Sequence, residues 1–295
     1  MGTMLTATAW AGDTAALDRA LDAAFDSVRL IDSLLSPYRP ESEISRINWG
    51  AGSREQVVSQ TFAAVLREAL AVAAVSHGAF DPTLRNWHGV HFDQVARTVR
   101  LDGGLRLDFG GIAKGYALDR AALALVGVAD GGVLDLGGQV RFFGRRESGH
   151  GSRHQVGIVD PADAQRLLAL IDVDSGSVST SSQAERPGHI VDPRTGRPAG
   201  RARSVTVVAS AGTTADAWST AFFVLGCDSA LALAGPLDLD VLCVDQSVRW
   251  SAGLDGRVAL PTDSVAGSRG PAPAPTRAGV SAARPSTRRS RAPGS

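Results

Sequence analysis

The residues from Leu107 to Asp119 combine paired glycines with a lysine at the predicted start of a helix. Gly110 and Gly111 follow a strand-like segment, and Lys114 lies in the first turn of the helix expected after them. Glycines let a ligand approach the backbone closely, and the N–H groups at a helix N-terminus favour an anion. The stretch predicts a phosphate-binding turn, with Lys114 as a mobile positive charge. The alternative is a plain strand-to-helix turn with a solvated lysine.

Composition favours the first interpretation of Lys114. Of the 30 basic residues in the chain, 29 are arginine and one is lysine. A lysine that mattered only as a surface charge would be expected to be arginine, as at every other basic position. We therefore treat Lys114 as a candidate ligand-binding residue.

A second stretch, from His189 to Pro198, places an imidazole, a carboxylate and a guanidinium within six positions, at His189, Asp192 and Arg194. Histidine suits general-base chemistry near neutral pH. Proline and glycine within the stretch predict a turn. The alternative is a polar surface turn in which Asp192 hydrogen-bonds its own backbone.

A third candidate is the pair Asp216 and Thr220. The two residues are four positions apart in a predicted helix, so their side chains share one face. A carboxylate and a hydroxyl oxygen suit a hard cation such as Mg²⁺. The alternative is that Asp216 only stabilises the dipole in the first turn of its helix.

Several common catalytic motifs do not occur in the sequence. It contains no GxxxxGK[ST] phosphate loop, no HExxH, no CxxC and no GxSxG. P-loop kinases, zinc proteases and serine hydrolases that use these motifs are therefore poor candidates.

The elements that must position these residues follow from hydrophobic periodicity. The pattern predicts four helices, at residues 13–36, 59–77, 112–126 and 213–225. Strands are predicted at residues 98–101, 105–109, 133–143, 154–159, 168–173, 204–210 and 241–244. Loops are expected at 37–53 and 175–202. This irregular order predicts an α+β fold.

Charge is divided unevenly along the chain. Thirty basic and thirty acidic residues balance, but the last 31 residues hold six arginines and no acid. The rest of the chain therefore carries a formal charge of −6, which argues against nucleic acid as a partner. Residues 261–295 consist mostly of Pro, Ala, Gly, Ser and Arg, a composition that predicts a disordered tail.

The sequence also bears on the compartment. It has no apolar run of about 18 residues, so no transmembrane segment is expected, and no signal peptide or lipoprotein leader is visible. Cys227 and Cys243 lie in apolar surroundings and are interpreted as small core residues, with a disulfide framework not expected. The predicted location is the cytoplasm.

Taken together, these stretches resemble the ApbE-like family of FAD:protein FMN transferases. The resemblance extends from about Met1 to about Val244. It includes Tyr38-Arg39-Pro40 with the following SEISRIN, the GAFDPT at residues 78–83, the glycine–lysine stretch at 108–119, Leu136-Gly137-Gly138, the HIVDPRTG at 189–196 and the ADAWSTA at 215–221. It implies a single domain over residues 1–260, with a mixed or antiparallel sheet and flanking helices.

The resemblance also implies a reaction. Such enzymes cleave FAD and attach FMN through a phosphoester to a Thr or Ser of a target flavoprotein, releasing AMP. Asp216, Thr220 and the Ala113 carbonyl would bind Mg²⁺. His189 would be the base, aided by Asp192 and Arg194. The residues implied to bind FAD are Tyr38, Asp81, Asp108, Gly110, Gly111, Lys114, Asp119, Gly137, Gly138, Thr180 and Ser181.

The sequence departs from the family pattern in two places. Gln139 stands where the family commonly has aspartate. Residues 179–186 resemble the family's ATSGDYER, but the tyrosine is replaced by Ala184 and the chain reaches His189 without an extra hairpin. Two alternatives stay open: a Mg²⁺-dependent FAD pyrophosphatase that produces FMN and AMP, and a protein that binds FAD without turnover.

Overall fold

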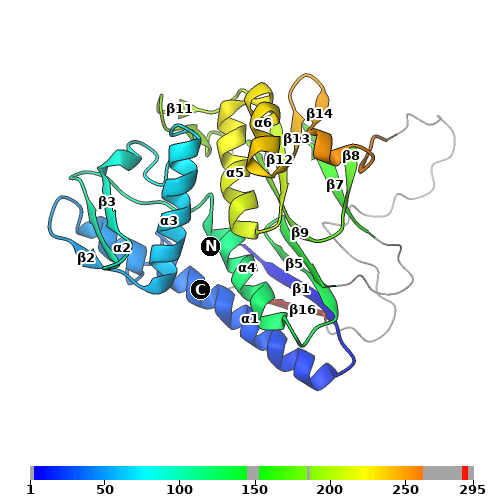
Figure 1. The fold of residues 1–295 in the computed structure, drawn as a ribbon, viewed down its shortest axis with the longest axis horizontal. Coiled ribbons are helices and arrows are strands. Elements are labelled where there is room, and N and C mark those ends of the chain that lie inside the picture. The colour runs from blue at the N-terminus through cyan, green and yellow to red at the C-terminus, as the bar shows by residue number, and fades with distance from the viewer. Residues whose placement is uncertain (1–2, 145–152, 185–186, 262–287, 292–295) are drawn as a thin grey trace.

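Helices pack on one face of a central antiparallel sheet, and a smaller sheet packs on its other face (Figure 1). The computed structural model describes residues 3–144, 153–184, 187–261 and 288–291. The central sheet has eight strands in the order β14-β13-β12-β9-β6-β5-β1-β16, and all its neighbouring strands are antiparallel. This arrangement confirms the predicted α+β fold.

The strands belong to four sheets. The central sheet consists of β1 (Leu5–Trp10), β5 (Gly131–Leu136), β6 (Gln139–Gly144), β9 (Gly176–Ser182), β12 (Ser204–Ala209), β13 (Asp240–Val244), β14 (Val248–Trp250) and β16 (Arg288–Arg291). The others are β7 (His154–Asp160), β8 (Asp163–Val173) and β15 (Val258–Ala259); β2 (Gln56–Val57), β3 (Val90–Asp93) and β4 (Thr98–Leu101); and β10 (Val191–Asp192) with β11 (Arg197–Pro198).

The helices are α1 (Thr14–Leu35), α2 (Glu43–Trp49), α3 (Gln60–Val75), α4 (Ala113–Leu125), α5 (Gly212–Leu225) and α6 (Cys227–Ala234). Four of them confirm predicted helices. Two begin at side-chain caps, since Asp13 accepts a hydrogen bond from Ala16 N at 2.9 Å and Ser59 accepts one from Phe62 N at 3.1 Å. In the part of the chain that the structure describes, none of the helices has the length and apolar surface needed to cross a bilayer.

The apolar core has two parts because strand residues alternate between the faces of the central sheet. Leu134 and Val207 pack into the larger part beneath α1, α4 and α5, whereas Val133 and Val208, their neighbours in sequence, pack against β7 and β8. A strand that is covered on both faces shows no alternation of buried and exposed residues, as in β12, where all six residues are buried.

Several elements differ from the sequence prediction. The predicted strand at 133–143 is a hairpin that turns at Gly137 and Gly138, whose φ angles are 61° and 87°. Strand β4 pairs with β2 and β3, and residues 105–109 form no strand. Helix α2 lies within the predicted loop 37–53, and β9 lies within the predicted loop 175–202. The elements β1 and α6 have no counterpart among the predicted elements.

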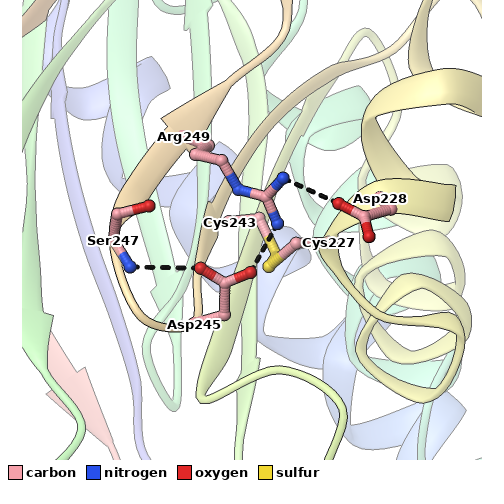
Figure 2. Close-up of a disulfide and its surroundings, with 6 residues drawn as sticks. All are labelled: Cys227, Asp228, Cys243, Asp245, Ser247 and Arg249. Atoms are coloured by element: carbon pink, nitrogen blue, oxygen red, sulfur yellow. Dashed lines mark hydrogen bonds and ion pairs between the residues drawn. A yellow bond between two sulfur atoms is a disulfide. The ribbon is translucent and has the colours of Figure 1, made fainter.

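The prediction of two unbonded core cysteines is wrong. Both residues are buried as expected, but Cys227 and Cys243 form a disulfide with a Cα–Cα distance of 5.6 Å (Figure 2). Helix α6 begins at Cys227 and packs on β13, which brings the two thiols together. Arg249 lies beside this bond and pairs with Asp228 at 2.7 Å and with Asp245.

The predicted tail is described only in part. Residues Arg288–Arg291 form β16, whose backbone pairs with β1 at the edge of the central sheet, where Arg291 lies opposite Leu5. The remaining residues after 261 lie outside the described residues. The domain division at residue 260 therefore stays a prediction.

Candidate active site

Helices α4 and α5 meet near their N-termini, where one glycine on each helix lets the two backbones touch. A β-carbon on Gly115 would collide with the Gly212 carbonyl group, and one on Gly212 would lie 2.6 Å from the Gly115 carbonyl oxygen. Only glycine allows the two backbones to approach this closely. The contact brings together the glycine–lysine stretch and the ADAWSTA helix, which lie about a hundred residues apart in the sequence.

Asp119 fixes this crossing from the α4 side. Its carboxylate accepts hydrogen bonds from Gly212 N at 2.7 Å, from Thr213 N at 2.8 Å and from the Thr213 hydroxyl at 2.8 Å. Arg141 on β6 adds an ion pair to Asp119 at 3.3 Å and donates to the Ser210 carbonyl at 2.7 Å. Asp119 therefore acts as the N-terminal cap of α5, a task that its predicted role at the flavin did not include.

Lys114 and Asp216 form an ion pair across the helix crossing. The Lys114 Nζ lies 2.9 Å from Asp216 Oδ1 and 3.4 Å from the Gly110 carbonyl oxygen. The second carboxylate oxygen, Oδ2, accepts from the Gly115 amide N–H at 3.0 Å. The Asp216 side chain is only 3% exposed, whereas that of Lys114 is 29% exposed. The pair thus joins two of the predicted site residues and opens to solvent on the lysine side.

A group of hydroxyls lies beside Asp216. Ser219 donates to the Asp216 carbonyl oxygen at 2.9 Å, and its oxygen lies 3.1 Å from Ser179 Oγ and 2.9 Å from Ser181 Oγ. The Ser219 oxygen can accept from both serines, and either oxygen of each serine pair can be the donor. Thr220 donates to the Asp216 carbonyl oxygen at 3.3 Å. The lone pairs of Ser181 and Thr220 therefore remain available as acceptors.

Gly111, the second glycine of the lysine stretch, lies next to the Thr220 hydroxyl. A β-carbon on Gly111 would lie 3.0 Å from Thr220 Oγ1 and 3.2 Å from the Phe80 ring. The turn itself is held by Asp108, whose Oδ1 accepts from Gly110 N at 2.6 Å. The predicted ligand-binding turn is thus adjacent to the Asp216 and Thr220 pair.

The GAFDPT loop supports this turn. Asp81 Oδ1 accepts from the Thr83 backbone and hydroxyl, both at 2.7 Å, and its Oδ2 accepts from Trp87 N at 3.0 Å. The Pro82 carbonyl oxygen then accepts from Asp108 N at 2.7 Å. In this structure the Asp81 carboxylate orders its own loop, which in turn contacts the glycine stretch.

The His189 stretch forms the short β10–β11 hairpin and its approach. Asp192 and Arg194 bond to each other through two contacts, Nε to Oδ1 at 2.8 Å and Nη2 to Oδ2 at 2.9 Å. The hydrogen bond from the Arg194 guanidinium lowers the pKa of Asp192 below its ordinary value, against the opposing effect of burial. His189 is exposed. Arg194 also lies beside Gly78, since a β-carbon on Gly78 would be 3.8 Å from Arg194 Cγ.

Gln183 connects this hairpin to the end of β9. Its side-chain N–H group donates to the carbonyl oxygens of Ile190 at 2.8 Å and of Ala199 at 3.2 Å. The two carbonyls lie at the two ends of the hairpin, so one side chain holds both. Gln183 stands where the ATSGDYER pattern of the family has aspartate. In this chain the replacement holds the two ends of the hairpin together.

The other four residues implied to bind FAD are Tyr38, Thr180, Gly137 and Gly138. Tyr38 follows α1 with 81% of its surface exposed. Thr180 points to the face of β9 opposite to Ser179 and Ser181, where it bonds Thr206 at 2.8 Å. Gly137 and Gly138 form the β5–β6 turn, and the next residue, Gln139, donates to the Gly212 carbonyl oxygen at 2.9 Å.

The oxygen atoms around Asp216 fit a Mg²⁺ site in their chemistry. Each carboxylate oxygen of Asp216 has a second lone pair beyond the one used by Lys114 or Gly115, and Thr220 retains both of its own. Magnesium takes one or two carboxylates and completes its shell with neutral oxygens, water and substrate phosphates. Over the described ranges, no group of three His, Cys, Asp or Glu side chains is placed to hold a metal ion. Any Mg²⁺ site here must therefore use few carboxylates.

Sequence reasoning missed three residues that organise the site. Ser219 orders the hydroxyl group, Arg141 supports Asp119, and Ser179 bonds Ser219. The sequence did contain a signal for Ser179, because Ser177, Ser179 and Ser181 alternate at strand spacing and so share one face of β9. No local pattern indicated Arg141, because its contacts are with Asp119 in α4 and with Ser210 after β12, both distant in the sequence.

The fold and this site correspond to a known class of proteins. The sequence matches the family model described as the ApbE family over residues 1–88 and 84–243. The chain belongs to the ApbE family, as the resemblance predicted.

Curated relatives in this family carry a common name. The chain is 32% identical to a protein of Treponema pallidum (strain Nichols) called FAD:protein FMN transferase, with 81% of each chain covered. It is 29% identical to a protein of the same name from Klebsiella pneumoniae (strain 342), with 76% of this chain and 81% of the relative covered. These names confirm the predicted enzyme class, a transferase.

Solved structures have the same fold. The ApbE protein of Thermotoga maritima matches with a TM-score of 0.75 and 28% identity, covering 81% of this chain and 91% of that one. The flavin transferase ApbE of Vibrio cholerae matches with a TM-score of 0.74 and 24% identity over 87% of this chain and 96% of that one, a likeness of fold alone.

Proposed function

We propose that this chain is a Mg²⁺-dependent FAD:protein FMN transferase. It cleaves FAD at the pyrophosphate and attaches FMN through a phosphoester to a Thr or Ser hydroxyl of a target flavoprotein, releasing AMP. The observation that carries the proposal is the Lys114–Asp216 pair, which lies beside the Thr220 and Ser181 hydroxyls at the start of α4. The names of the curated relatives support the same activity.

The pyrophosphate of FAD is assigned to the turn at Gly110 and Gly111. The Lys114 ammonium supports this assignment, because it lies 3.4 Å from the Gly110 carbonyl oxygen and is close enough to the turn to reach a bound phosphate. The resemblance to the family supports further FAD contacts at Tyr38, Asp81, Asp108, Asp119, Gly137, Gly138 and Ser181, and at Thr180 through its backbone, since the Thr180 side chain lies on the other face of β9.

The reaction is a phosphoryl transfer between two oxygens. The acceptor hydroxyl forms a bond to the phosphorus on the FMN side, the bond from that phosphorus to the AMP oxygen breaks, and His189 takes the hydroxyl proton. Mg²⁺ held by Asp216, Thr220 and the Ala113 carbonyl would neutralise charge on the pyrophosphate. Lys114 positions the phosphates, and the Asp192–Arg194 pair holds the turn that carries His189.

Transfer to a protein can be separated from the two alternative activities in one assay. The purified protein is incubated with FAD, MgCl₂ and candidate acceptor proteins, and the products are identified by mass spectrometry. The transferase predicts an acceptor that gains one FMN and an equal amount of AMP, with neither formed when EDTA is present. FMN found only free in solution would identify a pyrophosphatase, and intact bound FAD without AMP would identify a binding protein.

The compartment is a separate question with two opposing indications. The composition led to a predicted cytoplasmic location, whereas a buried disulfide such as Cys227–Cys243 is typical of proteins in oxidising compartments. Counting free thiols in protein isolated from its own cells distinguishes them. Two blocked thiols would support an oxidising compartment, and two free ones would support the cytoplasm.

A further inference from the structure

The ammonium of Lys114 uses the carboxylate that the proposed cation would need. Asp216 Oδ1 accepts from Lys114 Nζ at 2.9 Å. Asp216 is the only acidic side chain among the proposed Mg²⁺ ligands. Ion pairing stabilises this carboxylate, which is 3% exposed, because an isolated buried charge is unfavourable.

A carboxylate of charge −1 cannot easily serve two cations at once. An ammonium and a divalent cation on the same buried carboxylate would place three positive charges against one negative charge. Charges repel more strongly away from bulk water, and this repulsion would weaken the binding of the metal. The two cations therefore compete for Asp216 unless another anion enters the site.

The Lys114 ammonium has a second oxygen within reach. Its other contact is the Gly110 carbonyl oxygen at 3.4 Å, in the turn to which the pyrophosphate is assigned. The lysine stem has four flexible carbons, and 29% of the side chain is exposed, so the ammonium can move without a change in the backbone. The carboxylate, in contrast, is held in place by the Gly115 amide at 3.0 Å.

We propose that Lys114 and a divalent cation bind the Asp216 carboxylate in turn. A diphosphate group at the Gly110–Gly111 turn accepts the displaced ammonium, so the metal and the diphosphate each raise the affinity for the other. The inference rests on the proposed function for the identity of the two ligands. It adds to that function a coupling that makes the site bind metal tightly only when a diphosphate is present.

The first test compares metal binding by variants without any substrate. Lys114→Met removes the competing ammonium, so its affinity for Mn²⁺, measured by electron paramagnetic resonance, should be about tenfold higher than that of the parent chain. Arg120→Met removes a positive charge from an exposed position of the same helix and should bind Mn²⁺ like the parent. An unchanged or lower affinity in Lys114→Met would overturn the proposal.

A second test needs no variant, in case Lys114→Met fails to fold. The chain contains one lysine, so protein made with ¹³Cε-labelled lysine gives a single lysine signal in the NMR spectrum. Saturating Mg²⁺ should shift this signal, and ADP added as a diphosphate probe should shift it again. A lysine signal that stays constant while calorimetry detects Mg²⁺ binding would also overturn the proposal.

These measurements are independent of FMN transfer. A protein that shows the lysine shift and the affinity change but labels no acceptor would refute the transferase and retain the exchange. A protein that transfers FMN while its lysine signal is insensitive to Mg²⁺ would support the transferase and refute the exchange.

Discussion

Gly115 in α4 and Gly212 at the start of α5 are in backbone contact, with no room for a β-carbon on either residue. This contact sets the distance between Lys114, next to Gly115, and Asp216, one helical turn after Gly212. Any residue larger than glycine at position 115 must push the two helices apart. The geometry of the site is therefore sensitive to a single methyl group that touches no proposed ligand.

We expect Gly115→Ala to lower the free energy of unfolding by about 1–3 kcal/mol, the usual effect of forcing an atom into a packed interior. FMN transfer should also fall, because the Lys114–Asp216 pair would be displaced. Urea unfolding and the transfer assay measure the two effects. Gly12→Ala is the matched control, since a β-carbon there meets no atom within 4 Å. Equal stability of the two variants would contradict the close contact.

Asp216→Asn tests the proposed metal role. The amide keeps the shape of the side chain but removes the negative charge, so Mg²⁺-dependent turnover should fall by about a hundredfold or more. Asp228→Asn serves as the control, because its carboxylate is 92% exposed and pairs with Arg249 near the disulfide. Turnover near that of the parent chain in Asp216→Asn would refute the assignment.

His189→Ala tests the proposed base. Loss of a general base typically lowers turnover by about 10²- to 10⁴-fold. His91→Ala is the control, because His91 is an exposed histidine that bonds Asp102 in a different sheet from the site. Turnover of His189→Ala close to that of the parent chain would assign the base elsewhere.

Asp192→Asn tests the pH dependence of stability. The pKa of Asp192 lies below 3.8 in the folded chain because of Arg194. The folded state therefore binds this proton less readily than the unfolded state. The Asp192–Arg194 pair stabilises the fold when the pH is above the ordinary pKa of aspartate. This stabilisation is lost as the pH falls through the lower pKa of Asp192 in the folded chain. The parent should be more stable than the variant at about pH 7, and the difference should shrink at about pH 3. A difference that stays constant over this range would exclude the carboxylate charge as its source.

Removal of the disulfide should reduce stability and leave the chemistry intact. The bond joins residues 16 positions apart, and a loop of that size corresponds to a stabilisation of about 3 kcal/mol. The Cys227→Ala, Cys243→Ala double variant should unfold at a lower urea concentration and transfer FMN at the parent's rate at low temperature. Unchanged stability would show that the bond adds nothing to the fold.

Local patterns predicted the parts of this protein whose causes are local. The helix at Thr14–Leu35 follows from apolar spacing and the Asp13 cap, and α4 and α5 follow from similar signals. The glycine–lysine and ADAWSTA stretches indicated two halves of one site before their contact was known. The ligands of these residues stay a prediction, because a solvated lysine or a helix-dipole aspartate would give the same local pattern.

Features that depend on distant contacts could not be predicted in this way. Strand β9 is rich in serine and reads as a turn, yet it pairs with β6 and β12 and bonds α5 through its hydroxyls. The disulfide depends on α6, which had no clear periodic signal. Asp119 was expected at the flavin, and its carboxylate caps a helix that starts 93 residues later.

The separation of Lys114 and Asp216 by 102 positions has a consequence for the synthesis of the protein. Until α5 has left the ribosome, the nascent chain carries Lys114 and its glycine turn but lacks the Asp216 carboxylate that pairs with the lysine. The cation site can therefore arise only late in synthesis, after β9 and β12 have been made. Truncated products that end before α5 lack both Asp216 and Thr220, the two side chains proposed to hold the cation.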